Sequence, residues 1–221
     1  MSIRTETYQT IKKELDEKQV TLVAVSKTKP VEDILELYKL GHRDFGENYV
    51  QEMLTKAGQL PKDIRWHYIG HLQTNKVKLI APFVQLIHGV DSLKLLEEIN
   101  KQTEKHGRMQ ECLLQVHIAD EETKFGMDVS EIKELMNEYR DRQMNNVRIV
   151  GLMGMASFTD DMNKVRKEFQ NMKRIFDELQ TPDSRLLTLS MGMSSDYKIA
   201  IEEGSNMVRI GSLLFGERSS H

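Results

Sequence analysis

The segment TLVAVSKTKP, residues 21–30, is typical of a short apolar strand that ends on an amine. Side chains alternate along a strand, so Val23, Val25 and Lys27 are expected to point the same way. A lysine enclosed there, close to the like charge of Lys29, is expected to have a lowered pKa and to form a Schiff base with an aldehyde. The alternative is a lysine whose stem lies along the apolar wall while its ammonium reaches solvent.

From this segment to the end of the chain, short β-rich runs alternate with amphipathic stretches. Strands joined by helices form parallel sheets, and repeated units of this kind predict a closed barrel. We therefore expect an α/β fold, a single (β/α)8 TIM barrel that spans residues 1–221 as one domain. The expected strands are Thr21–Lys27, Arg43–Phe45, Trp66–Ile69, Val84–His88, Cys112–Ile118, Val147–Met155, Leu186–Leu189 and Met207–Ile210.

Two helical patterns bear on how the barrel is packed. Before the first strand, Tyr8, Ile11 and Leu15 recur at helical spacing and predict an N-terminal helix that closes the barrel over the seam between the last and first strands. No helix is expected after the last strand. A longer stripe of methionine and aromatic residues is interpreted as core packing rather than as a cofactor contact. Its members are Met162, Val165, Phe169, Met172, Phe176 and Leu179.

Composition excludes several classes of partner. The 31 basic and 34 acidic residues nearly cancel, to a formal charge of -3, and 39% of the 221 residues are hydrophobic. Neither nucleic acid nor a membrane is therefore expected as a partner. Cys112 is the only cysteine, so no disulfide framework or thiolate metal cluster is possible. The polar N-terminus and the absence of an apolar run of about 18 residues favour a cytoplasmic protein.

In a barrel of this class the chemistry lies where the strands end, so residues there are screened together. Asn48 follows the second expected strand and is interpreted as a helix N-cap, or as an amide that orients a ligand oxygen. His67 and His71 are four residues apart, but they straddle a strand end and Gly70, so no metal site is predicted. Dinucleotide and Walker-type phosphate motifs are absent from the sequence.

Two C-terminal motifs predict a phosphate site. The stretch LSMGMSSD, residues 189–196, joins a strand to a helix and brings hydroxyls and N–H groups to a helix N-terminus. In the next strand Arg209 is expected to face inward, followed by Gly211, which permits close backbone approach, and Ser212, which adds a donor. A serine-rich helix cap without a ligand is the structural alternative for the first motif. Together with Lys27, these parts are what is needed to hold pyridoxal 5'-phosphate (PLP).

Several motifs closely resemble the pyridoxal phosphate homeostasis protein family, whose members are relatives of the alanine racemase N-terminal barrel. The resemblance runs over nearly the whole chain. It rests on AVSKT at 24–28, FGEN at 45–48, WHYIGHLQTNK at 66–76, SMGMS at 190–194 and RIGSLLFGE at 209–217. It implies a fold-type III barrel in which Lys27 carries the internal aldimine of PLP and Arg209 faces the pyridine nitrogen.

The resemblance also assigns the remaining cofactor-binding residues. Ser194, Gly211 and Ser212 are expected near the phosphate, and Asn48 beside the ring. The SMGMS motif adds Ser190 and Met191. The sequence departs from the family pattern at Tyr68, at Ala156-Ser157 and at His117, which is kept as a pocket residue able to donate a hydrogen bond to the ring.

An arginine only donates hydrogen bonds, so it would leave the pyridine nitrogen unprotonated and the ring a poor electron sink. Alanine racemases with this arrangement add a second domain that supplies a catalytic tyrosine, and this chain is expected to lack one because it ends at the barrel. We assign no catalytic residue, although Tyr49 and Tyr68 stay open as acid or base.

Three hypotheses follow. The first is a monomeric cytoplasmic protein that holds PLP reversibly on Lys27, serves vitamin B6 homeostasis, delivers PLP to PLP-dependent apo-enzymes and has little or no catalytic activity. The second is a PLP-dependent racemase or lyase acting on a small amino acid. The third is a Schiff-base aldolase that acts on a sugar phosphate and uses Lys27 directly.

Overall fold

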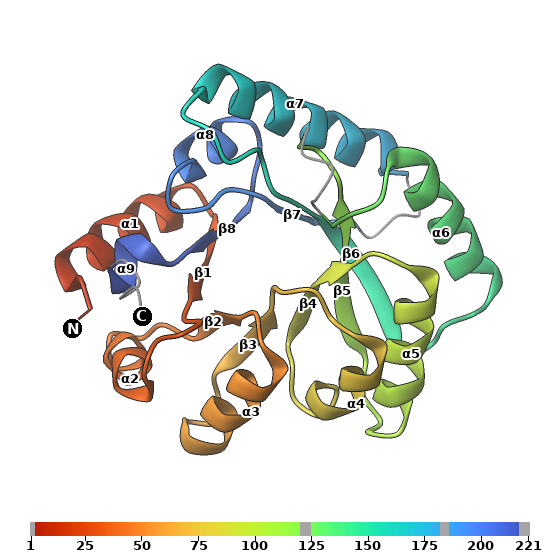
Figure 1. Cartoon of the computed structure of the whole chain (residues 1–221), viewed down its shortest axis with the longest axis horizontal. Coiled ribbons are helices and arrows are strands. Elements are labelled where there is room, and N and C mark those ends of the chain that lie inside the picture. The colour runs from red at the N-terminus through yellow and green to blue at the C-terminus, as the bar shows by residue number, and fades with distance from the viewer. Residues whose placement is uncertain (1–2, 120–124, 182–185, 217–221) are drawn as a thin grey trace.

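The computed structural model describes residues 3–119, 125–181 and 186–216, and its strands form a closed parallel barrel. The strands are β1 (Thr21–Val25), β2 (Asp44–Glu47), β3 (Arg65–Tyr68), β4 (Leu86–Val90), β5 (Gln110–Val116), β6 (Val147–Gly154), β7 (Thr188–Ser190) and β8 (Met207–Ile210). They follow one another around the barrel in chain order, and β8 pairs with β1 to close it (Figure 1). The predicted α/β barrel is therefore confirmed.

Helices surround the barrel on its outer side (Figure 1). They are α1 (Thr5–Glu17), α2 (Val31–Lys39), α3 (Val50–Gln59), the 3-10 turn η1 (Thr74–Lys76), α4 (Val77–Ile80), α5 (Leu93–Glu104), α6 (Val129–Asp141), α7 (Met162–Leu179), α8 (Tyr197–Glu202) and α9 (Ser212–Phe215). Among the described residues, no helix has both the length and the apolar character needed to cross a bilayer.

Every predicted strand is present, and most of the boundaries shift by one to three residues. The strand β1 ends at Val25 rather than Lys27, and Thr28 takes a left-handed backbone with φ of 64°. The strand β4 begins at Leu86 rather than Val84, because the Val84 N–H donates to the Ile80 carbonyl in the turn after α4. Local turns of this kind end a strand where composition alone would continue it.

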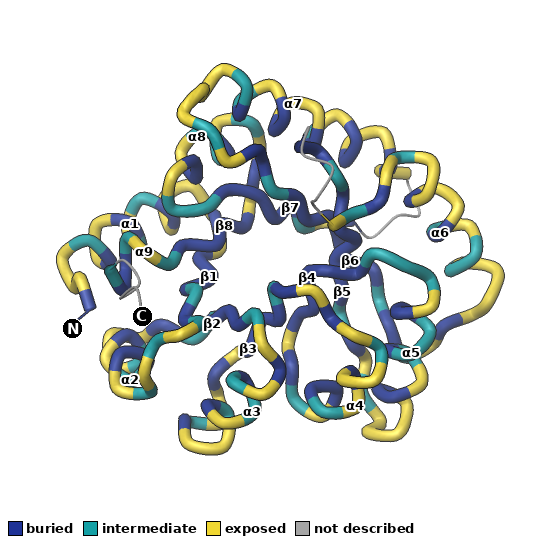
Figure 2. The backbone as a smooth tube through the Cα atoms, in the orientation of Figure 1, coloured by how far each residue is buried: buried dark blue, intermediate teal, exposed yellow. Residues whose placement is uncertain are grey.

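The strands carry an inner and an outer apolar layer. The main core lies between the strands and the helices, and Figure 2 shows buried strands inside helices whose outer faces are exposed. A separate cluster fills the barrel interior. Its members are Val23, Leu86, Leu113, Val150, Met153 and Met207, with Met155 packed against them. Because Met207 faces inward, alternation along β8 directs Arg209 to the interior side as well, while Lys27 lies two residues beyond the end of β1.

The N-terminal helix α1 closes the barrel as predicted. Tyr8, Ile11 and Leu15 are buried, and α1 packs against β1 and α9. The Arg4 N–H donates to the Leu214 carbonyl and ties the two ends of the chain together. The expectation of no helix after the last strand is wrong, because the four residues of α9 form one short turn there.

The stripe on α7 is core packing, with one exception. Val165, Phe169, Met172, Phe176 and Leu179 are buried, as predicted. Met162 is 37% exposed, because it is the first residue of the helix and lies beyond the part that packs on the barrel.

Candidate functional site

Arg209 lies within β8, and Lys27 follows the end of β1, the strand that pairs with β8. In the pairing of β1 with β8, Val23 is opposite Arg209. Arg209 is therefore level with a residue four positions before Lys27, and it lies deeper in the barrel. Lys27 follows the end of β1 and is half-buried. Lys27 therefore follows the C-terminal end of the barrel wall, and Arg209 lies deeper along that wall, level with Val23.

The segment around Lys27 is held by a buried ion pair on its outer side. The Ser26 hydroxyl donates to Oε1 of Glu47 at 2.6 Å, and Nζ of Lys56 donates to the same oxygen at 2.8 Å and to the Ser26 carbonyl at 2.7 Å. Glu47 is fully buried, and burial raises the pKa of its carboxyl while the Lys56 ammonium opposes that shift. The backbone just before Lys27 is thus fixed to β2 and α3.

The residues after Lys27 are held as well. The Thr28 N–H donates to Oε1 of Glu52 at 2.6 Å, and this carboxylate also accepts from Lys56 at 2.7 Å. Nζ of Lys29 donates to the carbonyls of Phe215 and Gly216, at 3.0 and 3.2 Å, so the like charge expected beside Lys27 is directed to the end of α9. The lowered pKa of Lys27 stays a prediction.

Asn48 is not a helix N-cap, and that interpretation is wrong. The helix α3 begins at Val50 with Tyr49 in the capping position, because the chain stays extended for one residue more than expected. Oδ1 of Asn48 is buried and has no hydrogen-bond partner among the described residues. A buried amide oxygen without a partner costs free energy, so the second interpretation, an amide that contacts a ligand, accounts for it better.

The backbone of Asn48 is clamped by β3. The Tyr68 hydroxyl lies 3.0 Å from the Asn48 carbonyl and 3.1 Å from the His71 carbonyl, and burial raises the pKa of Tyr68 to about 12. Gly70 packs so closely that a Cβ there would lie 2.3 Å from the Asn48 carbonyl oxygen. The departure from the family pattern at Tyr68 is therefore a structural contact with the neighbouring loop.

Arg209 is buried, with 4% of its surface exposed. Both terminal nitrogens of its guanidinium donate hydrogen bonds within the barrel. Nη1 donates to the Ser190 hydroxyl at 2.7 Å and to the Ser190 carbonyl at 3.0 Å, and Nη2 donates to the Gly154 carbonyl at 3.0 Å. Burial lowers the pKa of Arg209 to about 10, and the charge of Asp196 opposes that shift. The side chain is a fixed donor inside the barrel.

The loops after β7 and β8 come together as the phosphate prediction requires. The Gly211 N–H donates to the Ser194 hydroxyl at 3.2 Å. The buried carboxylate of Asp196 accepts from the Met193 N–H at 2.6 Å and closes the turn that carries Ser194. Ser212 begins α9 and is exposed, and the first N–H groups of a helix have no partner within it.

Two predicted site residues, Met191 and His117, lie apart from the paired loops after β7 and β8. Met191 is fully buried in the main core, so its side chain points to the helices and only its backbone faces the loop. His117 follows β5 and is half-buried beside Phe125 and Met155. Its N–H donates to the Met127 carbonyl at 3.0 Å, which places it at the mouth but in a loop of its own.

His67 and His71 do not converge. His67 is buried and bonds to Asp44 through Nε2, while His71 is 42% exposed in its side chain and pairs with Asp91 at 3.3 Å. The His71 ring also stacks on Phe125 at 4.4 Å. The described part of the chain contains no group of three or more His, Cys, Asp or Glu residues placed to hold a metal ion.

The second departure from the family pattern, at Ser157, is also structural. Its hydroxyl donates to one carboxylate oxygen of Glu168 at 2.6 Å, and its N–H donates to the other at 2.7 Å. Both residues are buried. The carboxylate on α7 thus fixes the loop after β6.

Sequence reasoning missed the residues that support the site. Glu47 stood in a quoted motif without a role, and Ser26 and His88 were not singled out. The signal for Lys56 was its place three residues after Met53, on the buried face of α3, where a lysine needs a partner. The partners themselves come from other elements and leave no local pattern.

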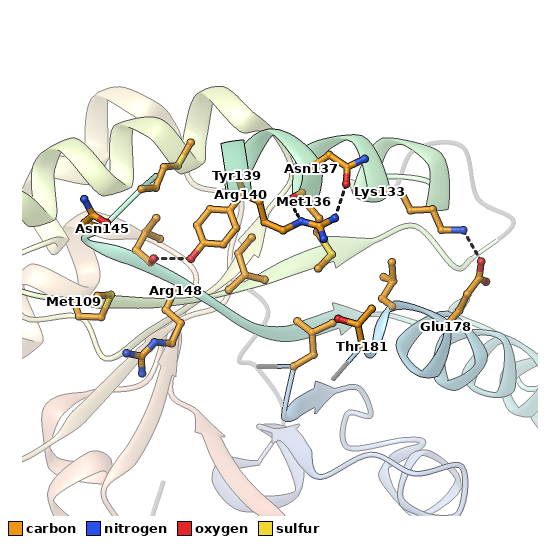
Figure 3. Close-up of a pocket in the computed structure, with 15 residues that line it drawn as sticks. Met109, Lys133, Met136, Asn137, Tyr139, Arg140, Asn145, Arg148, Glu178 and Thr181 are labelled. Atoms are coloured by element: carbon orange, nitrogen blue, oxygen red, sulfur yellow. Dashed lines mark hydrogen bonds and ion pairs between the residues drawn. The ribbon is translucent and has the colours of Figure 1, made fainter. Parts of the chain in front are cut away.

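A sizeable cavity among the described residues lies away from the barrel mouth. It has a volume of about 570 Å³ and opens between α6 and α7, near the start of β6 (Figure 3). Tyr139, Arg148 and Met109 lie on its wall, at the end of the barrel opposite Lys27. Its location excludes it as the site assembled by the predicted residues.

A family model described as "Alanine racemase, N-terminal domain" matches residues 5–219. A pyridoxal phosphate homeostasis protein of Aquifex aeolicus is 45% identical over 199 residues, which cover 89% of this chain and 86% of the relative. The human protein of the same description is 41% identical over 214 residues, covering 90% of this chain and 77% of the relative.

Solved structures agree with these sequence matches. PipY of Synechococcus elongatus, described with PLP bound, superposes with a TM-score of 0.87 at 35% identity, covering 96% of this chain and 99% of PipY. An alanine racemase of Clostridium difficile has a TM-score of 0.75 at 18% identity and covers 97% of this chain and 56% of the racemase, which shows the shared fold alone. The chain therefore belongs to the pyridoxal phosphate homeostasis protein family, within the larger family of alanine racemase N-terminal domains.

Proposed function

We propose that this chain, as a single barrel domain over residues 1–221, binds PLP reversibly through Nζ of Lys27 and serves intracellular vitamin B6 homeostasis. The observation that carries the proposal is the buried Arg209 guanidinium, fixed by Ser190 and Gly154 in the barrel beneath the half-buried amine of Lys27. The relatives described as pyridoxal phosphate homeostasis proteins and the PipY structure with PLP support the same ligand.

The residues present fit this cofactor. Asn48 offers a buried amide oxygen without a partner, and the paired loops of Ser194 and Gly211 offer hydroxyl and backbone donors of the kind that hold a phosphate. Ser212 adds a donor at the start of α9, and His117 lies on the neighbouring part of the mouth. When bound, PLP supplies an aldehyde for the lysine and a ring whose electronic state depends on its nitrogen partner.

Little or no catalysis is the expected consequence of these contacts. Arg209 would donate a hydrogen bond to the ring nitrogen without protonating it, and the ring would then be a poor electron sink. Tyr68, a candidate acid or base, has its hydroxyl directed at two backbone carbonyls, and the raised pKa of about 12 disfavours its ionised form. Tyr49 is 60% exposed, so its ring is largely in solvent. A racemase or lyase would need a positioned base, and these residues do not supply one.

Absorbance tests the proposal. The purified protein, after incubation with PLP and gel filtration, is expected to keep a band in the near-ultraviolet to visible range, and Lys27→Ala is expected to lose it. The matched control is Lys29→Gln, which removes a neighbouring ammonium whose bonds go to α9. A band kept by Lys27→Ala, or lost equally by both variants, would contradict the assignment of Lys27. No band in the parent protein would favour the aldolase alternative.

The buffering role implies release. We expect a monomeric cytoplasmic protein that transfers PLP to PLP-dependent apo-enzymes without a nucleic acid or membrane partner. The near-neutral formal charge of -3 agrees with this set of partners. Mixing the loaded protein with an apo-transaminase and following activity tests transfer, and size-exclusion chromatography with light scattering tests the monomer.

A further inference from the structure

A line of polar side chains crosses the barrel interior, which is otherwise apolar. Nε2 of His67 lies 3.0 Å from Oδ1 of Asp44, and Nδ1 of His67 lies 3.0 Å from Nε2 of His88. Nδ1 of His88 lies 3.3 Å from the Ser190 hydroxyl, which accepts from Nη1 of Arg209 at 2.7 Å. The line runs from the first residue of β2 through β3, β4 and β7 to β8.

The direction of donation follows from the two ends of this line. Burial would raise the pKa of Asp44, but hydrogen bonds from His67 and Arg65 outweigh it and hold that pKa well below the usual range. An ionised carboxylate only accepts, so Nε2 of His67 carries a proton. At the other end Arg209 only donates, so the Ser190 oxygen accepts from it and the hydroxyl proton is available to another acceptor.

The middle of the line is decided by His88, which is fully buried. Burial, together with the nearby charge of Arg209, holds the pKa of His88 well below its usual value, so the ring is neutral. A neutral ring has one donor and one acceptor nitrogen. With the Ser190 proton directed to Nδ1, Nε2 of His88 donates to the lone pair on Nδ1 of His67. Every bond then points from Arg209 toward Asp44.

We propose that Asp44, His67, His88 and Ser190 form a one-directional hydrogen-bond chain through the barrel that positions the Arg209 guanidinium against the cofactor ring. The chain gives the Arg209 guanidinium a fixed acceptor, the Ser190 hydroxyl. His88 is a positioning residue, since it acts on the ring only through Ser190 and Arg209. The inference rests on the proposed function for the identity of the ligand, but the chain itself is tested without it.

The outer end of the chain explains how it is anchored. Asp44 also accepts from Nε of Arg65 at 2.7 Å, and Arg65 is half-exposed at the rim opposite the site. Three charged groups take part in the hydrogen bonds of this chain among the described residues. They are Asp44, its partner Arg65, and Arg209. Leu86 and Leu113 line the same interior and are apolar, so each polar member depends on its neighbours in the chain.

The first test is long-range proton–nitrogen NMR of the cofactor-free protein, labelled with nitrogen-15 on histidine, at about pH 7. The signals are assigned by comparison with His67→Gln and His88→Gln. The expected result is one ring proton on each of the two residues, on Nε2 in both. A proton on Nδ1 of either ring, or protons on both nitrogens of His67, would overturn the chain as drawn.

The second test uses loaded protein. His88→Leu interrupts the chain, whereas His88→Gln keeps one donor and one acceptor, and Leu113→Val is the control for lost volume in the same interior layer. We expect His88→Leu to shift the absorption maximum of bound PLP and to weaken its retention about tenfold, the effect of one hydrogen bond to a charged group. His88→Gln should recover most of both, and Leu113→Val should resemble the parent.

The outcomes separate the two proposals. If His88→Leu, His88→Gln and Leu113→Val all resemble one another in spectrum and retention, the imidazole only fills space and the positioning role is wrong. If the parent itself shows no PLP band, the proposed function fails, while the NMR result still decides whether the chain exists. Borohydride reduction of His88→Leu should still label Lys27, because the substitution leaves that amine in place.

Discussion

Lys27 stands on a backbone that its surroundings have to hold. Thr28, the next residue, has a left-handed conformation with φ of 64°, which costs a β-branched residue about 1–3 kcal/mol. The bond from the Thr28 N–H to Glu52, and the bonds from Lys56 to Glu47 and Glu52, offset that cost. The position of the amine therefore depends on a lysine one helix away.

Lys56→Met is predicted to destabilise the protein by about 3–5 kcal/mol, because it leaves the buried Glu47 charge without its partner. The pKa of Glu47 is raised in the folded state, so its proton adds stability below the unfolded pKa, and that stability is lost as pH rises through the folded pKa. The loss in free energy of unfolding caused by Lys56→Met, relative to the parent protein, should therefore be smaller at about pH 5 than at about pH 7.5.

Denaturant unfolding at the two pH values measures this effect. Lys62→Met is the matched control, because Lys62 is exposed and, among the residues that the structure describes, donates to the Ala57 carbonyl alone. It should change stability by no more than about 0.5 kcal/mol. A Lys56→Met variant as stable as Lys62→Met, or one whose loss grows on acidification, would contradict the role given to the buried pair.

The hydroxyls of Ser194 and Ser212 carry the second residue-scale prediction. Replacing both with Ala should weaken retention of PLP far more than that of pyridoxal, because each charge-assisted bond to a phosphate contributes about 1.5–3 kcal/mol. Equilibrium dialysis with both ligands gives the ratio. Equal losses for PLP and pyridoxal would place the phosphate elsewhere, and Ser195→Ala, an exposed neighbour, controls for the loop.

At the scale of elements, the site depends on how closely the ends of β2 and β3 approach. Asn48 follows β2, and its carbonyl lies 3.0 Å from the Tyr68 hydroxyl at the end of β3. Gly70 leaves no room for a Cβ, which would lie 2.3 Å from the same carbonyl oxygen. Backbone cannot yield as a flexible side chain does, so a larger residue at Gly70 moves the loop that presents Asn48.

Gly70→Ala is therefore predicted to lower stability by about 1–3 kcal/mol and to weaken PLP retention at the same time. Gly58→Ala is the control, because Gly58 lies within α3 with no atom within 4 Å of the place a Cβ would take, and helix propensity favours alanine there by about 0.5–1 kcal/mol. Thermal unfolding and dialysis measure both quantities. Parent-like retention by Gly70→Ala would show that Asn48 does not contact the ligand.

For the whole molecule, strand alternation predicted most of what is arranged inside the barrel. Arg209 was placed on the interior side from a period of two residues, and Tyr8, Ile11 and Leu15 were placed in a closing helix from a period near four. The inward direction of Lys27, which follows the end of β1, stays a prediction. These periods are properties of a short stretch of sequence, so they can be recognised without knowing which strand pairs with which.

What could not be predicted involves partners distant in sequence or single-residue boundaries. His88 and Ser190 are 102 positions apart, and neither shows in its own strand that the other will bond to it. Asn48 was misread as a helix cap because α3 starts one residue later than its glycine turn suggests. Whether a polar side chain caps a helix or becomes buried depends on the residues that pack around it. Those neighbours are determined only when the whole barrel has closed.

Catalysis is tested on the whole molecule. If Arg209 donates to the ring nitrogen as proposed, and with the Tyr68 hydroxyl directed at backbone carbonyls, the loaded protein should exchange the α-protons of small amino acids slowly, since a missing base costs about 10²–10⁴ in rate. Incubation with L- and D-alanine in heavy water, followed by NMR and chiral chromatography, measures exchange. A rate of about 1 s⁻¹ or more would favour the racemase alternative.

The central claim is that Lys27 holds the cofactor, and borohydride reduction followed by peptide mass mapping tests it most directly. Reduction makes the bond between an amine and the PLP aldehyde permanent, so the modified lysine can be read from the peptide masses. The pyridoxyl group is predicted on Lys27 alone, in the peptide that also contains Ser26 and Thr28. A label on Lys29, Lys56 or any other lysine, with Lys27 unmodified, would contradict it.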